Sequence, residues 1–366
     1  MPTNSKQAKP DSMPRLLIHG LDSLYVCYNF ELSTSKIDFS ELEYRKQLAR
    51  DREEDRAIID IGGERFQVRA VGQYPYRFVL VNRDFSFALA ERMHPSLKVQ
   101  FYSEALWRDG AQALHERVMA WATALGVTTF NGEQVIRADW AFDFELKAID
   151  FTEDHFVTRA RKNSKWREGQ SVQTFSFGTG DIVLRVYDKV AEIENASNKS
   201  WFYDLWGQKE NVWRVEFQIR SERLKVAAIR TLVDLEDLQG DLLTQLALEH
   251  TTLRRPSGDS NRARWPLHPL WQSLGAAIAT MPLMGLCRAY DKRNPLEYRY
   301  RKQAQSLYGY LKGLGALMHL TNPQKPAPSF DEMLKELPKA LRHFHTDSLW
   351  KSEVDRRIRM HEVGQW

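Results

Sequence analysis

The sequence predicts an α+β fold, with an N-terminal antiparallel sheet carrying helices on one face and an all-α domain after it. Up to about residue 220, short segments alternate apolar and polar residues, which is typical of strands with one buried face. From Glu222 onward, apolar residues recur at helical spacing instead. We therefore expect a disordered tail over residues 1–13, an α+β catalytic domain over 14–222 and a helical domain over 223–366.

The individual elements follow from the same periodicities and from turn residues such as the Gly62-Gly63 pair. Three strands with unusual polar faces are described below. The other predicted strands are 14–31 (a strand or a hairpin), 57–63, 65–71, 76–82, 96–102 and 172–177. The predicted helices are 41–56, 110–126, 152–162, 222–236, 238–253, 266–280, 295–320, 330–345 (kinked or interrupted at Pro338) and 348–362.

Three segments in the middle of the chain alternate strictly, and their polar faces carry an unusual set of side chains. They read RADWAFDFE (137–145), IVLRVYDK (182–189) and WRVEFQIR (213–220). An ordinary solvent face carries Thr, Lys and Ser in no particular order. Here the first and third strands present carboxylates, and the second presents a tyrosine between two cations. If the three strands are neighbours in one sheet, that face is a candidate site.

The carboxylates on this face suggest a metal ion. Asp139, Asp143 and Glu216 would repel one another unless a cation neutralised them. Oxygen ligands favour a hard divalent ion, so we expect Mg²⁺ or Mn²⁺. On its own, an Asp-x-x-x-Asp strand is often an ordinary surface.

The tyrosine suggests covalent chemistry on a phosphate. The ordinary pKa of a phenol is about 10, which makes it a weak nucleophile at neutral pH. Arg185 and Lys189 lie two residues either side of Tyr187, so we expect their charges to favour the phenolate. They would also stabilise the charge on a phosphoryl group under attack. A lone strand tyrosine is usually a packing residue, and only the combination indicates phosphodiester transesterification.

These blocks resemble the trans-acting replication initiator family of rolling-circle plasmids, which includes initiators of filamentous phages and relaxases of some integrative elements. RADWAFD is similar to the family's Arg-x-Asp-x-Ala-x-Asp block, LRVYDKVAE (184–192) to its tyrosine block and WRVEFQIR to its Arg-x-Glu strand. TFSFGTG (174–180) resembles the family's strand before the tyrosine, with a shorter turn that lacks the usual serine. The N-terminal GLDSLYVCYNF (20–30) weakly resembles the opening strand, so the resemblance covers roughly the first 220 residues.

The resemblance implies a mechanism. Tyr187 would attack one strand of replication-origin DNA, keep the 5′-phosphate as a phosphotyrosine ester and free a 3′-OH primer. A later 3′-OH would reverse the step and re-join the strand without ATP. Asp139, Asp143 and Glu216 would form the metal site, while Arg185 and Lys189 would contact the scissile phosphate. The alternative from another class is a catalytically idle, sequence-specific DNA-binding regulator on the same scaffold.

Basic segments with interleaved aromatic residues are the candidate DNA-binding surfaces, because cations bind phosphates and aromatic rings stack on unpaired bases. A solvated loop is the equally plausible reading of any one of them. The candidate residues are Arg159, Arg161, Lys162, Lys165, Trp166 and Arg167 in the first segment and Arg254, Arg255, Arg262 and Arg264 in the second. A third segment, 288–302, mixes six cations with Tyr290, Tyr298 and Tyr300.

A second constellation competes for the nicking role. His343 and His345 have the letters of the paired-histidine metal motif of a different class of DNA-nicking enzyme, and Tyr308 with Lys312 has that class's tyrosine-lysine spacing. The histidines, however, lie in a segment with helical spacing. Histidines two apart on a helix point about 200° apart and cannot share a metal.

Composition and cysteine content limit the cellular compartments and partners that we expect. The net charge is only +4, and the two cysteines, Cys27 and Cys287, lie far apart without a CxxC motif, so we expect a reducing cytoplasm. Residues 1–13 lack a signal-peptide pattern, and no apolar run approaches 18 residues, so we expect no membrane partner. Besides duplex and single-stranded origin DNA, a host helicase and a homodimer are expected partners.

Overall fold

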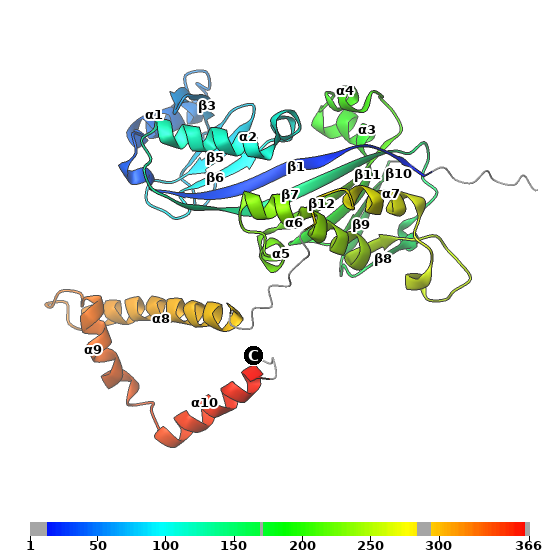
Figure 1. Ribbon diagram of the computed structural model, residues 1–366. Helices are drawn as coiled ribbons and strands as arrows, with labels where there is room; N and C mark the ends of the chain where they lie inside the picture. The colour runs from blue at the N-terminus through cyan, green and yellow to red at the C-terminus, as the bar shows by residue number, and fades with distance from the viewer. Residues whose placement is uncertain (1–12, 169–170, 284–293, 363–366) are drawn as a thin grey trace, which may run out of the picture. The chain divides into compact units, whose positions relative to one another are not determined.

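The computed structural model describes residues 13–168, 171–283 and 294–362 (Figure 1). The predicted tail over 1–13 therefore lies almost wholly outside the described residues. The chain divides into two compact units, Met1–Ala289 and Tyr290–Trp366. The predicted boundary at residue 222 differs from this division, because the helices that follow it pack on the sheet.

The first unit is built on an eleven-stranded antiparallel sheet in the order β2-β3-β4-β5-β6-β1-β7-β12-β11-β10-β9. Its centre is formed by two strands of 16 residues each, β1 (Arg15–Phe30) and β7 (Phe130–Glu145). The other strands are β2 (Ile58–Ile61), β3 (Glu64–Val68), β4 (Phe78–Val81), β5 (Phe85–Leu89), β6 (Leu97–Phe101), β9 (Asn163–Glu168), β10 (Ser171–Phe177), β11 (Ile182–Asp188) and β12 (Val212–Arg220). The predicted antiparallel sheet is thus confirmed, and the segment 14–31 is one strand.

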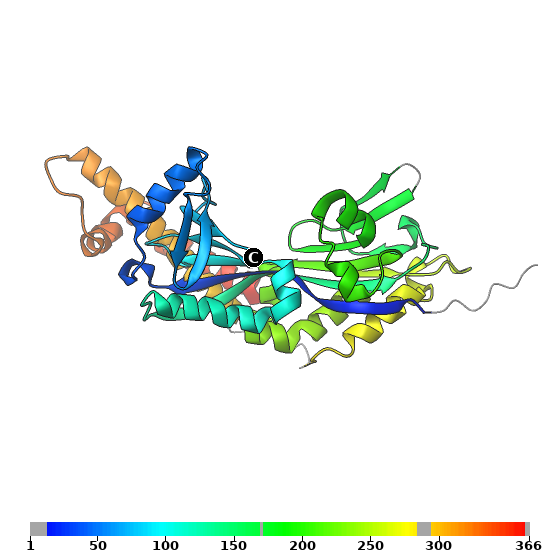
Figure 2. The ribbon, with the colours of Figure 1, turned by 90° about the horizontal axis from the view of Figure 1, so that it is seen from above.

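One face of the sheet is apolar and is covered by helices. In β7, Ala138, Trp140, Phe142 and Phe144 are fully buried in the main core. Figure 2 shows α2 (Ser103–Ala124), α6 (Leu232–Gln245) and α7 (Pro269–Ile278) in a row along this side of the sheet. Burying an aromatic side chain contributes about 2–3 kcal/mol, so this layer supplies much of the stability of the unit.

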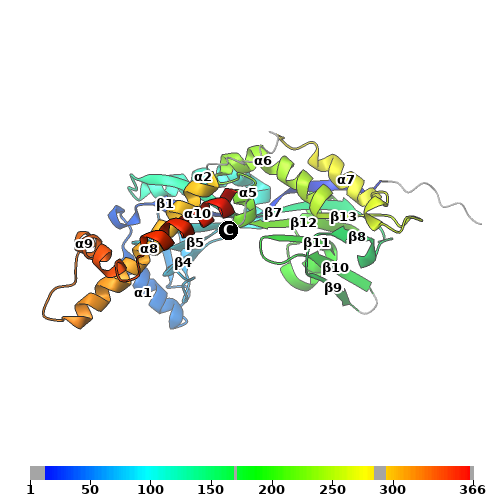
Figure 3. The same ribbon diagram turned by 90° about the horizontal axis from the view of Figure 1, so that it is seen from below.

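The helices after the sheet belong to the same core. α5 (Ser221–Val226) follows β12 directly, and Gln239 of α6 accepts a hydrogen bond from the Trp140 indole at 3.0 Å. Trp271 of α7 is buried and donates to the Ala247 carbonyl at 2.8 Å. Figure 3 shows α5, α6 and α7 lying along one side of β7 and β12. The physical reason for the later domain boundary is therefore that these helices cover the apolar face of the site strands.

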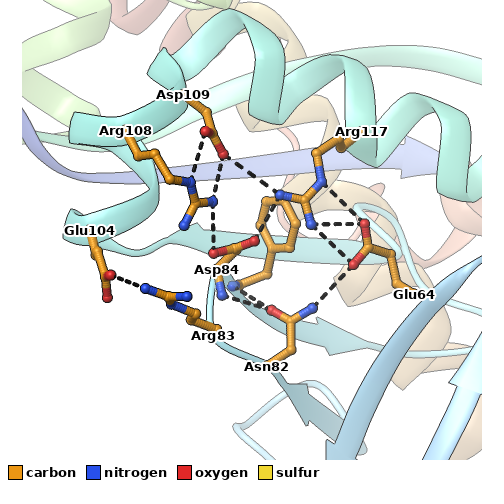
Figure 4. A network of polar contacts seen from close by, with 9 residues as sticks. Glu64, Asn82, Arg83, Asp84, Glu104, Arg108, Asp109 and Arg117 are labelled. Atoms are coloured by element: carbon orange, nitrogen blue, oxygen red, sulfur yellow. Dashed lines mark hydrogen bonds and ion pairs between the residues drawn. The ribbon is translucent and has the colours of Figure 1, made fainter.

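A network of ion pairs joins α2 to β3 and to the turn before β5 (Figure 4). Arg117 bonds Glu64 at 2.9 Å and Asp84 at 2.8 Å, and Arg108 bonds Asp84 at 3.1 Å. The oxygen of Asn82 accepts the backbone N–H groups of Asp84 and Phe85. The remaining ion pairs join Arg83 with Glu104, Arg108 with Asp109 and Arg117 with Asp109, and Asn82 donates a hydrogen bond to Glu64. Within α2, Gly110 has a positive φ of 82°, which marks a kink that the sequence pattern did not predict.

Several local predictions differ from the structure. Residues 152–162 form no helix but a 3-10 turn (Glu153–His155) and a short strand, β8 (Phe156–Thr158), paired with β13 (Thr251–Leu253). The helix expected over 238–253 therefore ends in a π-helical turn (Leu246–His250) and this strand. The first helix, α1 (Phe39–Arg50), is shorter than predicted because Asp51 and the following turn end it. β5 was not predicted, nor was the segment between β11 and β12, which holds α3 (Lys189–Glu192), a π-helical turn (Ile193–Ser197) and α4 (Phe202–Trp206).

The second unit consists, in its described part, of α8 (Asn294–Thr321), α9 (Phe330–Leu341) and α10 (Asp347–Glu362). All three agree closely with the predicted helices, and Pro338 lies inside α9. Ser329 and Glu332 form a capping box at the start of α9. No helix among the described residues is long and apolar enough to cross a membrane.

Candidate active site

The three predicted site strands are neighbours in the sheet, in the order β7-β12-β11. Arg185 lies opposite Glu216, which lies opposite Ala141, and Tyr187 lies opposite Arg214, which lies opposite Asp143. Because side chains in register on adjacent strands share a face, these polar groups gather on the face opposite the main core. This face is called the site face below.

At the centre of the site face, Tyr187 and Glu216 are hydrogen-bonded. The Tyr187 hydroxyl donates to Glu216 Oε2 at 2.8 Å, and Arg185 Nη1 donates to Glu216 Oε1 at 2.8 Å. Gln218 accepts a longer bond of 3.3 Å from the same guanidinium. One carboxylate therefore receives the phenol on one oxygen and a guanidinium on the other, which fixes its orientation.

The surroundings of Tyr187 do not favour the phenolate, contrary to the expectation from sequence. Its side chain is buried, with 8% exposure. Burial raises the pKa of Tyr187 well above its ordinary value, and the Glu216 charge raises it further. Arg185 is paired with Glu216, and Lys189 is paired with Glu192. The two cations are thus already engaged, and Tyr187 needs a proton acceptor to become a nucleophile.

Lys189 lies beside the tyrosine ring rather than beside its hydroxyl. Its Nζ is 5.7 Å from the centre of the Tyr187 ring and 5.2 Å from that of Phe202. Burial lowers the pKa of Lys189, and the neighbouring Arg214 charge lowers it further. In this arrangement Lys189 supports the tyrosine ring and contributes positive charge from one side.

Asp143 belongs to a fully buried ion pair. Arg214 Nε donates to Asp143 Oδ1 at 2.6 Å and Nη2 to Oδ2 at 2.8 Å, while the Trp206 indole donates to Oδ2 at 2.9 Å. Both Asp143 and Arg214 have 0% side-chain exposure. The remaining guanidinium nitrogen of Arg214 lies 3.1 Å from Asp22, as an ion pair without good hydrogen-bond geometry. Asp143 is therefore a structural anion that neutralises Arg214.

Asp22 completes this network from β1, at a bulge between Leu21 and Ser23. It accepts hydrogen bonds from Ser103 at 2.8 Å and from the Trp107 indole at 3.0 Å. Although burial acts in the opposite direction, the nearby Arg214 and Lys199 charges hold the pKa of Asp22 far below its ordinary value. The buried carboxylates of Asp22 and Asp143 thus both pair with the buried guanidinium of Arg214.

Asp139 lies on the other side of Glu216 and is bound by Arg137 of its own strand. Arg137 Nε donates to Asp139 Oδ1 at 2.9 Å. Burial nevertheless raises the pKa of Asp139 to about 6, and the Glu216 charge acts in the same direction. Asp139 and Glu216 are therefore close enough for their charges to interact.

The three predicted metal ligands do not converge on one point. Asp143 and Asp139 are four residues apart on β7, which separates them by about 13 Å along the strand. Each of the three carboxylates is also held by an arginine: Asp139 by Arg137, Asp143 by Arg214 and Glu216 by Arg185. Among the described residues, no three His, Cys, Asp or Glu side chains are placed to hold one metal ion. As a three-carboxylate set, the predicted ligands do not fit.

The segment between β11 and β12 covers part of the site face. Phe202 and Trp206 form a second apolar cluster with Ile193 and Val212, against which Ile18 and Trp107 pack. The Phe202 ring lies over the Arg214 guanidinium at 4.5 Å. Asn198 and Gly207 have positive φ values of 55° and 67° at the ends of its helical turns. This covering segment, residues 188–207, explains why Tyr187 and Arg214 are buried on a face that is polar.

The first predicted DNA-binding patch lies at the edge of the sheet, close to the tyrosine strand. Tyr187 is opposite Thr174 of β10, and Thr174 is opposite Trp166 of the edge strand β9. The cations Arg159, Arg161 and Lys162 are exposed, and within the described residues they form no ion pair; Lys165 pairs with Glu153 at 3.2 Å. The side chains of Trp166 and Arg167 lie outside the described residues.

The second predicted patch follows β13. Arg254 and Arg262 donate to the carbonyls of Trp265 and Phe156, at 2.6 and 2.9 Å, so they hold the loop in place. Arg255 approaches Asp150 at 3.4 Å, and Arg264 is largely exposed. Of the third segment, residues 288–293 and the side chains of Tyr298, Arg299, Arg301 and Lys302 are not described; Tyr300 is 75% exposed.

The competing histidine constellation lies elsewhere, in the second unit. His345 pairs with Asp347 at 2.7 Å in the turn between α9 and α10, and His343 is exposed. On α8, Lys312 Nζ lies 4.4 Å from the centre of the Tyr308 ring.

The structure also shows functional candidates that the sequence reading did not select. Arg137 and Arg214 are visible in the strand pattern, since they share faces with Asp139 and Glu216. No sequence pattern marks Asp22 as a site residue, because its contacts depend on a bulge in β1 and on the approach of α2. Phe202 and Trp206 lie in a segment with no strand or helix periodicity.

Comparison with known proteins finds a likeness among solved structures only. No family model and no curated protein matches the chain. Among solved structures, the chain is similar to that of a rolling circle replication initiator protein from Geobacillus stearothermophilus, with 18% sequence identity and a TM-score of 0.42. The match covers 72% of this chain and 97% of that chain.

Proposed function

We propose that this protein is a rolling-circle replication initiator that nicks and re-joins one strand of origin DNA through Tyr187. The observation that carries the proposal is the hydrogen bond from the Tyr187 hydroxyl to Glu216, which pairs a nucleophile with an oriented base. The resemblance of the three sequence blocks to the trans-acting initiator family supports the same role. These blocks lie on adjacent strands with their polar residues on one face.

The proposed step is a transesterification. Glu216 takes the proton of the Tyr187 hydroxyl as its oxygen forms a bond with phosphorus. The bond between phosphorus and the 3′ oxygen breaks, and the leaving oxygen takes a proton from solvent to become a 3′-OH. The 5′-phosphate stays on Tyr187 as an ester. Attack by a 3′-OH on this ester reverses the step, so no nucleotide cofactor is required.

Cations around the hydroxyl supply the remaining stabilisation. Arg185 is one-third exposed and adjoins the Tyr187–Glu216 pair, so it can bind a non-bridging phosphate oxygen. Lys189 is buried beside the Tyr187 ring and contributes charge without reaching solvent. Because Tyr187 is itself buried, the covering segment 188–207 must move for a phosphate to reach it.

A divalent cation remains part of the proposal in a reduced form. Asp139 and Glu216, whose charges interact, would have to be released from Arg137 and Arg185 before they could hold Mg²⁺ or Mn²⁺. Such an ion would stabilise the charge that develops on the phosphoryl oxygens. Titration of Mn²⁺ into the wild type and into Asp139→Asn tests this, since only the former should bind it.

The second unit is proposed to bind the duplex origin or a helicase, and a dimer of the whole chain is also part of this proposal.

The alternative, a DNA-binding regulator without chemistry, makes a distinct prediction. In that case the wild-type protein would bind origin DNA but leave a supercoiled origin plasmid intact. We expect instead that it converts the plasmid to the open-circular form in the presence of Mg²⁺ or Mn²⁺. Tyr187→Phe should leave the plasmid supercoiled.

A further inference from the structure

Beyond the proposed nicking site, the site face carries a row of alternating cations and an aromatic ring on β6, β1 and β7. Lys98 Nζ lies 5.4 Å from the centre of the Tyr25 ring, and Arg137 Cζ lies 5.1 Å from the same centre. Tyr25 is opposite Gln100 of β6 on one side and Arg137 of β7 on the other. We call Lys98, Tyr25 and Arg137 the cation–tyrosine row.

The row is not a closed internal cluster. All three side chains are half-buried, whereas their strand neighbours Leu97, Val99 and Ala138 are fully buried in the core on the opposite face. The covering segment 188–207 contacts the site face at Asp143 and Arg214, at the other end of the sheet's centre. The Tyr25 ring is therefore held between two cations on a part of the face that this segment leaves uncovered.

The charges of the row are unbalanced. Arg137 is paired with Asp139, but among the described residues Lys98 pairs with no carboxylate. Burial lowers the pKa of Lys98, and the Arg137 charge acts in the same direction. A half-buried ammonium beside a second cation costs free energy, which an anion bound there would offset.

The row is continuous with the proposed active site. Arg137 holds Asp139, Asp139 lies opposite Gln218, and Gln218 accepts a hydrogen bond from Arg185 beside Tyr187. From β11 to β6 the path crosses four strand spacings, about 19 Å at roughly 4.8 Å each. An extended polymer with anions at regular intervals matches a path of this length, whereas a single small anion does not.

We propose that the cation–tyrosine row is a binding subsite for single-stranded DNA, which holds the strand on one side of the scissile phosphate. Lys98 and Arg137 bind backbone phosphates, and Tyr25 offers a ring edge or face to an unpaired base. The row suits a single strand because a base paired in a duplex cannot stack on a side chain. This inference rests on the proposed function for its placement of the scissile phosphate at Tyr187.

Binding can be measured separately from nicking. Fluorescence anisotropy with a labelled single-stranded oligonucleotide, in EDTA, reports affinity without cleavage. We expect Lys98→Ala to weaken binding roughly tenfold and to reduce the salt dependence by about one phosphate contact. We expect Tyr25→Leu to weaken binding by a similar factor with little change in salt dependence. The matched controls are Lys225→Ala on α5, on the opposite side of the sheet, and Tyr74→Leu in an exposed loop.

A photocrosslinking measurement on the wild type guards against variants that misfold. An oligonucleotide carrying 5-iododeoxyuridine should crosslink to Tyr25, mapped by mass spectrometry. Crosslinking confined to other residues, together with Lys98→Ala and Tyr25→Leu variants that bind like the wild type, would overturn the subsite. If that happened while a Tyr187–DNA ester still formed, the proposed function would survive. Conversely, binding through the row without any ester at Tyr187 would support the subsite and refute the proposed function.

Discussion

The Tyr187 hydroxyl and the Glu216 carboxylate, on adjacent strands, are joined by a hydrogen bond of 2.8 Å in which the phenol is the donor. The second oxygen of Glu216 is held by Arg185 at 2.8 Å. Since burial raises the pKa of Tyr187, the phenol does not ionise by itself at neutral pH. We therefore propose Glu216 as the proton acceptor, whereas the sequence pattern suggests a metal ligand and two activating cations.

Replacing Glu216 by Gln removes the base but keeps the size of the side chain and its ability to accept hydrogen bonds. General-base catalysis typically contributes 10²–10⁴-fold, so we expect nicking to fall by about that factor. The melting temperature should change little. Single-turnover nicking of a single-stranded origin oligonucleotide measures the effect, with Glu222→Gln on α5 as the control. A Glu216→Gln rate within threefold of the wild type would show that another group takes the proton.

Asp143→Asn should act on stability rather than directly on chemistry. The substitution leaves the guanidinium of Arg214, which has 0% exposure, without its bidentate partner. Breaking a buried ion pair by removing one partner costs about 3–5 kcal/mol. Urea unfolding of the first unit measures this, and the double variant Asp143→Leu with Arg214→Met should recover much of the loss. A variant as stable as the wild type but inactive in nicking would instead place Asp143 in the chemistry.

The raised pKa of Asp139 predicts a specific dependence of the unfolding free energy on pH. Burial raises its pKa from 3.8 to about 6, so the folded state holds a proton over a pH range in which the unfolded state has lost it. The contribution of this group to folding therefore weakens as pH rises from about 4 to about 6, by roughly 3 kcal/mol. The difference in unfolding free energy between the wild type and Asp139→Asn isolates this change and should be flat above pH 7.

A control residue should show the opposite sign. Arg65 holds the pKa of the exposed Asp60 below its ordinary value, so Asp60 contributes stability that is lost as pH falls. The difference between the wild type and Asp60→Asn should therefore rise with pH in the acid range. If the difference in unfolding free energy between the wild type and Asp139→Asn did not change between pH 4 and 6, folding would not raise the pKa of Asp139.

Truncation should separate the two units at the boundary that the structure shows. A chain ending at Ala289 keeps α5, α6 and α7 on the apolar face, so it should fold and cleave a single-stranded origin. It should fail on the supercoiled duplex, where the second unit is proposed to act. A chain ending near Arg223 exposes Trp140 and its buried neighbours and should not fold. If the chain ending at Ala289 nicked the duplex origin as well as the full-length protein does, recognition of the origin would lie in the first unit.

Strand periodicity was sufficient to predict β7, β11 and β12 and the polar face that they share. It was sufficient because alternation is a local property, and each strand has one face in the core. The helix expected over 152–162 was wrong because its apolar residues, such as Phe156, pack in a short strand paired with β13. Such pairing with a distant segment leaves no local pattern.

The partners of the site residues were harder to predict than the residues themselves. The strand pattern marks Asp139, Asp143 and Glu216 as unusual, but their spacing does not reveal that Arg137, Arg214 and Arg185 neutralise them. Which cation meets which carboxylate depends on strand register, and register is set by the whole sheet. The covering of Arg214 and Asp143 by Phe202 and Trp206 depends on a segment with no periodic pattern at all.

Mapping the covalent adduct tests the central claim most directly. The wild-type protein is incubated with an origin oligonucleotide and Mg²⁺ or Mn²⁺, denatured, digested and analysed by mass spectrometry. We expect a 5′-phosphodeoxynucleotide ester on Tyr187, and we expect Tyr187→Phe to give no denaturation-resistant adduct while binding DNA within a few-fold of the wild type. An adduct on Tyr308, or cleavage with no adduct on any tyrosine, would contradict the account.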